Sequence, residues 1–108
     1  MLFRSVMPGI MNLHGHLGLV KGLTQARENY TQENIDAHLR TYASYGVTSV
    51  VSMGSDIEPD LILRIRNAQR DGRISGARVY TAGRGFTAQG GYPAVRSEER
   101  RVGKECRL

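Results

Sequence analysis

The sequence predicts an α/β fold in which three short strands alternate with two helices. Three observations predict it: short apolar runs at three places, two longer segments with apolar residues at helical spacing, and a glycine after each helical segment. Short turns join these segments, so we expect parallel strands connected by helical crossovers. With 108 residues, the chain is long enough for one small domain.

The first strand is expected just before residue 14. Ile10, Met11 and Leu13 form a short apolar run that is typical of a buried strand. Pro8 marks the start of this strand, where a missing backbone N–H matters least.

A helix is predicted over residues 29–45. Thr31 can cap its first turn, and Glu33 lies where a carboxylate complements the helix dipole. Gly46 is suited to end the helix. One apolar face is expected at i, i+4 and i+7, from Ile35, Leu39 and Tyr42.

A second strand is predicted at residues 47–52, which are short and rich in β-branched residues. After a turn at residues 54–56, a second helix should begin near Pro59, a favoured residue at the first helical position, and end before Gly72. The core face of this helix is expected from Leu61, Ile65 and Ala68.

A third strand is predicted at residues 78–82, followed by a long glycine-rich loop that ends at Tyr92 and Pro93. A complete (β/α)8 TIM barrel has eight strand–helix units in about 250 residues. Two and a half such units are recognisable here, so the sequence predicts a partial barrel with the order β-α-β-α-β.

Both ends of the chain resemble translated sequencing adapter. RSEERRVGKEC, within residues 96–108, is what a common sequencing adapter encodes in frame, and MLFRS at residues 1–5 matches the end of its paired adapter. The terminal stretch is also charge-dense and has no apolar period. We therefore expect a domain at residues 6–95, an adapter-derived start at residues 1–5 and a disordered tail at residues 96–108. The alternative is a genuine basic extension.

This assignment changes what the charge implies. The chain has a net charge of +5, but nine basic and seven acidic side chains lie between Val6 and Val95, a net charge of +2. Without a clustered basic footprint, no nucleic-acid partner is expected. Cys106 is the single cysteine, so neither an internal disulfide nor a cysteine-based zinc cluster is expected.

No apolar run approaches the ~20 residues of a membrane span, and no signal-peptide segment follows Met1. No membrane partner is therefore expected. The default localisation is cytoplasmic, although the adapter interpretation means that the natural N-terminus is missing.

His14 and His16 are the strongest chemical feature of the sequence. Residues i and i+2 of a strand point to the same face, so both imidazoles can reach one metal ion, and Gly15 between them adds no competing side chain. They lie at the carboxyl end of the first strand, where parallel α/β proteins place their active sites. Taken alone, the pair is equally well explained as two surface histidines.

The string VMPGIMNLHGHLG resembles the first barrel strand of the amidohydrolase superfamily, in which a Pro-Gly pair and an apolar run precede an H-x-H motif. The likeness continues in order through ENYTQENIDAHLRTYASYGVTSVVSMGS and RNAQRDGRISGARVYTAGRGFTAQGGYP. These segments cover nearly all of residues 6–93, which is far more specific than the histidine pair. The most similar subgroup is that of imidazolonepropionase-like and prolidase-like metal-dependent hydrolases.

The resemblance implies that His14 and His16 ligate the more buried of one or two divalent metal ions, usually zinc. In the family, a lysine or glutamate from strand four, histidines from strands five and six, and an aspartate from strand eight complete the site. The chain ends before those strands, so no catalytic residue is expected within it, and this truncated chain is expected to be inactive. The family hydrolyses carbon–nitrogen bonds in amides, cyclic amides or dipeptides through metal-activated water.

The resemblance also places four residues beside the substrate pocket as candidate contacts to a small-molecule substrate: Gln89, Gly90, Gly91 and Tyr92. A loop whose glycines need positive φ explains them equally well. A homo-oligomeric parent protein is compatible with the resemblance.

A second hypothesis is a small α/β module that binds a phosphate or nucleotide through the loop at residues 83–91. Residues 83–88 fit the loose dinucleotide fingerprint, but no helix is expected after them, so the helix N-terminus that holds phosphates is missing. A third hypothesis is that the chain does not fold stably, because three strands and two helices leave one strand edge exposed and one apolar face uncovered.

Two further polar residues have ordinary explanations. His38 is expected to be a packing or solvent-facing residue of the first helix. Asp56 could contact substrate or water at the metal site, and a turn before the second helix explains it equally well.

Overall fold

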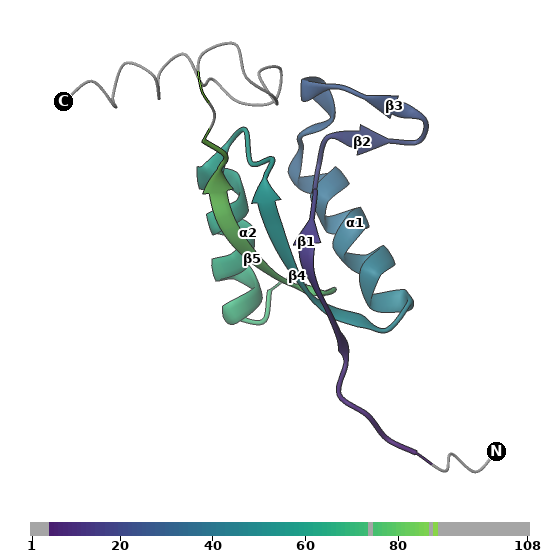
Figure 1. Ribbon diagram of the computed structural model, residues 1–108. Coiled ribbons are helices and arrows are strands. Elements are labelled where there is room, and N and C mark those ends of the chain that lie inside the picture. Colours follow the sequence, from purple (N-terminus) through teal and green to yellow (C-terminus); the bar gives the residue numbers. More distant parts are fainter. Residues whose placement is uncertain (1–4, 74, 87, 89–108) are drawn as a thin grey trace.

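The structure is a computed structural model that describes residues 5–73, 75–86 and 88 (Figure 1). Its centre is a sheet of three parallel strands in the order β1-β4-β5. The bounds of these strands are Ile10–Gly15 for β1, Val47–Gly54 for β4 and Arg78–Arg84 for β5.

Two helices connect these strands, α1 at Gln32–Ser44 and α2 at Pro59–Arg70. A two-stranded antiparallel ribbon, β2 at Val20–Lys21 with β3 at Thr24–Gln25, lies between β1 and α1 in the chain and leads into the 3-10 turn η1 at Arg27–Asn29. Figure 1 shows α1 beside β1, and α2 beside β5. The predicted alternation of three parallel strands with two helices is therefore confirmed, while the small ribbon was not predicted.

The signals at the helix ends are also confirmed. Thr31 caps α1, because its side-chain oxygen accepts a hydrogen bond from the backbone N–H of Asn34 at 3.3 Å. Pro59 begins α2, and Gly72 follows the last turn of that helix. No helix in the described part of the chain is long and apolar enough to cross a membrane.

One apolar core lies between the helices and a single face of the sheet. Val50 of β4 and Val79 of β5 are neighbours in the register and are fully buried on this face. Right-handed crossovers between successive parallel strands place both helices on the same side. The helical residues buried in the core are Ile35 and Leu39 of α1 and Leu61, Ile62 and Ile65 of α2.

The opposite face of the sheet has no covering layer among the described residues. Met11 pairs with Ser49, and Val51 pairs with Tyr80, on the face that alternates with Val50 and Val79. Met11 is 58% exposed and Leu13 is 64% exposed, and Ile10 is exposed as well. The prediction of a buried first strand is therefore wrong for its side chains, because both helices cover the other face. The expected uncovered apolar face is present.

Gly18 lies where the chain after β1 passes under the ring of Tyr30. Its φ is +82°, and a Cβ added there would lie 2.6 Å from a ring carbon of Tyr30. Gly22, in the turn of the β2–β3 ribbon, has a φ of +60° and no atom within 4 Å of the same position. A side chain at Gly22 would therefore meet backbone strain alone, whereas a side chain at Gly18 would also overlap with Tyr30.

We expect Gly18→Ala to lower the free energy of unfolding by about 2–4 kcal/mol, because a left-handed backbone and overpacking both oppose the methyl group. Gly22→Ala should cost about 1–2 kcal/mol, since only the backbone term applies. Urea unfolding of the two variants beside the unchanged chain measures the difference. Equal losses would contradict the close packing of Gly18 against Tyr30.

Candidate metal centre and its surroundings

His14 and His16 lie together at the carboxyl end of β1. Their ring centroids are 5.1 Å apart, with the ring planes at 86° to each other. Both side chains are exposed. Two adjacent and accessible imidazoles can donate nitrogen ligands to a common metal ion, which is the chemistry that zinc prefers.

The backbone around the histidine pair is held by two contacts. The side-chain oxygen of Asn12 accepts a hydrogen bond from the backbone N–H of His14 at 3.0 Å, and its amide donates to the hydroxyl of Tyr42 in α1 at 3.2 Å. Gly15 packs against β4 so closely that a Cβ would lie 2.6 Å from Val50. The glycine between the histidines is thus required by packing against the neighbouring strand.

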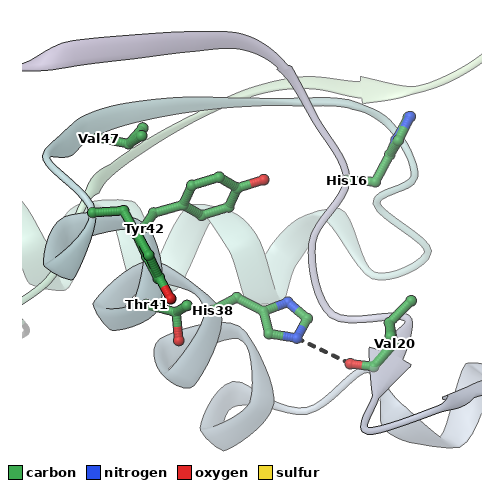
Figure 2. Close-up of a pocket in the computed structure, with 7 residues that line it drawn as sticks. His16, Val20, His38, Thr41, Tyr42 and Val47 are labelled. Atoms are coloured by element: carbon green, nitrogen blue, oxygen red, sulfur yellow. Dashed lines mark hydrogen bonds between the residues drawn. The ribbon is translucent and has the colours of Figure 1, made fainter.

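His38 of α1 holds the segment that follows His16. Its Nδ1 accepts a hydrogen bond from the backbone N–H of Gly18 at 3.2 Å, and its Nε2 lies 2.9 Å from the carbonyl oxygen of Val20 (Figure 2). With Nδ1 accepting, Nε2 must carry the proton and donate, so the ring is neutral in this arrangement. His38 was expected only to pack or to face solvent. It instead joins α1 to the chain after β1.

A cavity of about 470 Å³ opens between α1 and this segment. Figure 2 shows His16 on one side of it and the α1 side chains on the other. The lining is mostly apolar and comes from His16, Val20, His38, Thr41, Tyr42, Tyr45 and Val47. An apolar group could therefore lie beside one histidine of the pair.

Asp56 is buried just beyond the carboxyl end of β4. Its carboxylate accepts hydrogen bonds from three hydroxyl groups, those of Tyr30 at 3.2 Å, Ser52 at 2.5 Å and Thr81. We name these four residues the Asp56 cluster. Both carboxylate oxygens are engaged within the fold, which favours the structural explanation of Asp56 over contact with a substrate.

The surroundings of the Asp56 cluster raise the pKa of one of its members, Tyr30. Burial raises the pKa of the Tyr30 phenol far above that of free tyrosine, and the charge of Asp56 and the hydrogen bond to it raise the pKa further. The Tyr30 hydroxyl therefore remains a proton donor to Asp56 throughout the neutral and mildly alkaline range.

Sequence reasoning did not identify the roles of Tyr30, Ser52, Thr81 and His38. The partners of Asp56 lie as many as 26 residues away from it in the chain, and His38 is 20 residues from Gly18. Apart from Ser52, which is four residues from Asp56, no local spacing pattern marks these contacts, because only the packing of α1 and the sheet brings the residues together.

Several expected features lie beyond what the structure describes. The candidate substrate contacts Gln89, Gly90, Gly91 and Tyr92 are outside the described residues, as are residues 96–108. The strand β5 continues through Arg84, so the glycine-rich loop begins later than the sequence predicted. Within residues 5–73, 75–86 and 88, no group of three or more His, Cys, Asp or Glu side chains is placed to hold a metal ion.

Comparisons with known proteins give one structural likeness. No protein-family model matches the chain, and no curated protein matches it. The chain is similar to the crystal structure of a Xaa-Pro dipeptidase with bound methionine in the active site, with a TM-score of 0.62 and 24% sequence identity. The match covers 79% of this chain and 22% of the dipeptidase chain. It shows a shared α/β fold over a part of that larger protein.

We expect Tyr30→Phe to lower the free energy of unfolding by about 1 kcal/mol at pH 8, because the variant leaves Asp56 with one donor fewer. The pKa of Tyr30 is raised on folding, so its contribution is complete below the pKa of free tyrosine, about 10, and is lost as pH rises further. The loss in the free energy of unfolding that Tyr30→Phe causes should therefore shrink above about pH 10, by up to ~1.4 kcal/mol per pH unit.

Urea unfolding at pH 8, 10 and 11 measures this dependence. Tyr45→Phe is the matched control, because the Tyr45 side chain is 80% exposed and does not contact the Asp56 cluster. A deficit for Tyr30→Phe that stays constant from pH 8 to pH 11 would show that the phenol ionises normally in the folded chain.

Proposed function

We propose that this chain is the first β-α-β-α-β part of a metal-dependent hydrolase with a (β/α)8 barrel, and that it belongs to the amidohydrolase superfamily. The single observation that carries the proposal is the adjacent, accessible pair of His14 and His16 at the carboxyl end of the first parallel strand. The ordered resemblance of residues 6–93 to that superfamily and the shared fold with a Xaa-Pro dipeptidase support it.

The proposed substrate is a small molecule with a carbon–nitrogen bond, in an amide, a cyclic amide or a dipeptide. The two imidazoles fit a divalent metal such as zinc, because neutral imidazole nitrogen is among the ligands that zinc prefers. When bound, such a metal polarises a carbonyl and makes water a better nucleophile near neutral pH.

The residues of this chain supply binding and orientation in the proposed site. His14 and His16 provide two ligands, and Asn12 orients the backbone of His14 through its hydrogen bond. His38 holds the chain beyond His16 by its contacts to Gly18 and Val20. A catalytic zinc site normally has three protein ligands, so the chain by itself is expected to bind zinc weakly and to show no amidase activity.

Zinc titration of the full chain, followed by the histidine imidazole NMR signals, tests the ligand pair. We expect His14→Ala and His16→Ala each to weaken zinc binding more than about tenfold. Substitution of a residue that only orients a metal ligand already lowers metal affinity about 10- to 100-fold. The imidazole signal of His38 in the same spectra is the internal control and should not shift with zinc, since His38 already uses both ring nitrogens within the fold. Zinc binding that survives both alanine substitutions would rule out this site.

Sequencing the source DNA outward from the codons of Val6 and Val95 tests the hydrolase assignment separately. We expect an open reading frame that continues into further strand–helix units and encodes a strand-four lysine or glutamate, then two histidines and an aspartate. A genomic sequence that encodes residues 96–108 followed by a stop codon would contradict the proposal.

A further inference from the structure

Three polar side chains form a stripe along one face of α1. Asn34, His38 and Tyr42 are spaced four residues apart, so they lie on successive turns of the same face of the helix. We name these three residues the α1 stripe. Figure 2 shows His38 and Tyr42 of the stripe on α1, with His16 on the other side of the cavity. This face of α1 is therefore turned toward the chain that carries the histidine pair.

The α1 stripe holds the chain before the histidine pair through Tyr42. Its hydroxyl accepts a hydrogen bond from the side-chain NH2 group of Asn12 at 3.2 Å, and the side-chain oxygen of Asn12 accepts one from the backbone N–H of His14 at 3.0 Å. A backbone N–H can only donate, so Asn12 must turn its oxygen toward His14 and its NH2 group toward Tyr42. Asn12 pairs with the buried Val50 in the register, on the face of the sheet that the helices cover. One amide therefore links α1 to His14 without using the exposed face of the sheet.

The other two members of the α1 stripe hold the chain after the histidine pair. Both backbone groups of Gly18 are engaged, since its N–H donates to Nδ1 of His38 at 3.2 Å and its carbonyl oxygen accepts from the amide of Asn34 at 3.0 Å. The carbonyl oxygen of Val20 lies 2.9 Å from a nitrogen of each of the same two side chains. Leu17, just before these contacts, is fully buried. The segment between Asn12 and Gly18 is thus fixed at both ends by one helix.

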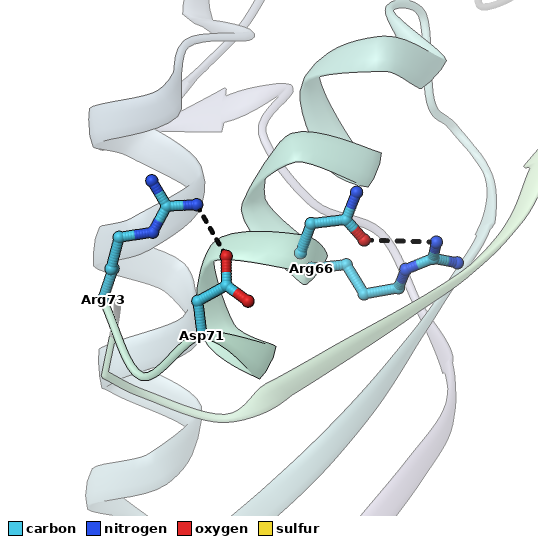
Figure 3. A network of polar contacts seen from close by, with 4 residues as sticks. Arg66, Asp71 and Arg73 are labelled. Atoms are coloured by element: carbon cyan, nitrogen blue, oxygen red, sulfur yellow. Dashed lines mark hydrogen bonds and ion pairs between the residues drawn. The ribbon is translucent and has the colours of Figure 1, made fainter.

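The polar contacts of α2 do not reach this segment among the described residues. The contacts drawn in Figure 3 join Arg73 to Asp71 at 2.8 Å and Arg66 to Asn67 at 3.4 Å, so they stay within α2 and the turn that follows it. Gln69 of α2 bonds to backbone groups around the start of β5. In the part of the chain that the structure describes, α1 is therefore the helix whose side chains hold both flanks of the histidine pair.

We infer that the α1 stripe positions His14 and His16 for metal binding. Both histidine side chains are exposed, so the contacts of the flanking backbone determine where the two rings lie. A pair of ligands that is already held in place loses less conformational freedom when a metal binds, and binding is tighter for that reason. The inference rests on the proposed function, because it gives the stripe a role in that metal centre.

Tyr42→Phe tests the contact before the histidine pair, since it removes one hydroxyl and keeps the ring. The rings of His14 and His16 have centroids 5.1 Å apart, so the metal-free chain should show a nuclear Overhauser effect between them. We expect Tyr42→Phe to weaken this effect and to lower zinc affinity about tenfold, as for other residues that orient a metal ligand. Tyr45→Phe is the matched control, because it makes the same change on the same helix at a side chain that is 80% exposed. It should change zinc affinity less than about twofold.

His38→Leu tests the contacts after the histidine pair and should also lower zinc affinity about tenfold. Urea unfolding of each variant shows whether it remains folded. If His38→Leu disturbs the fold, Tyr42→Phe decides the result. Unchanged zinc affinity in Tyr42→Phe, or equal losses in Tyr42→Phe and Tyr45→Phe, would overturn the inference.

The metal-free measurement separates this inference from the proposed metal centre. If the unchanged chain binds no zinc, the proposed metal centre fails, and the effect between the rings of His14 and His16 still tests the stripe. An effect that Tyr42→Phe weakens and Tyr45→Phe leaves unchanged would support the positioning role. An effect of full strength in Tyr42→Phe would overturn it.

Discussion

The burial of one carboxylate constrains the whole carboxyl end of this sheet. Asp56 is 1% exposed, and removing a carboxylate from water is unfavourable unless donors surround it. Its donors come from the segment before α1, from β4 and from β5, through Tyr30, Ser52 and Thr81. The same tyrosine ring covers Gly18, which His38 also holds. The position of the chain just after His16 therefore depends on contacts that begin at Asp56.

Helices cover one face of the sheet, and the other face has no covering layer among residues 5–73, 75–86 and 88. Val50 and Val79 are buried beneath both helices, whereas Met11 and Leu13 on β1 remain exposed. The histidine pair lies at the end of this same exposed strand. Right-handed crossovers explain the asymmetry, because each one adds its helix to the same side. The α/β fold that this chain shares with the dipeptidase covers only 22% of that larger chain.

The two ends of the sheet carry different chemistry. The carboxyl end has imidazole nitrogens and hydroxyl groups, which suit a metal ion and a buried carboxylate. Toward the start of β5, guanidinium groups surround a cavity that Gln69 separates from the strand edge. The imidazole pair and the guanidinium groups therefore lie at different ends of the same sheet.

Local sequence signals predicted the three parallel strands, the two helices and their order, but not the β2–β3 ribbon. The apolar spacing of Ile35 and Leu39, the cap at Thr31 and Pro59 at the start of α2 are local signals, and local backbone and side-chain chemistry decides them. The pairing of His14 with His16 follows from their spacing in the same way. Only the packing of distant segments decided which face of β1 is exposed, the Tyr30 and Thr81 donors of Asp56, and the placement of Arg66 and Arg78 around one cavity. Those features depend on residues far apart in the chain, which are brought together only when the helices pack against one side of the sheet.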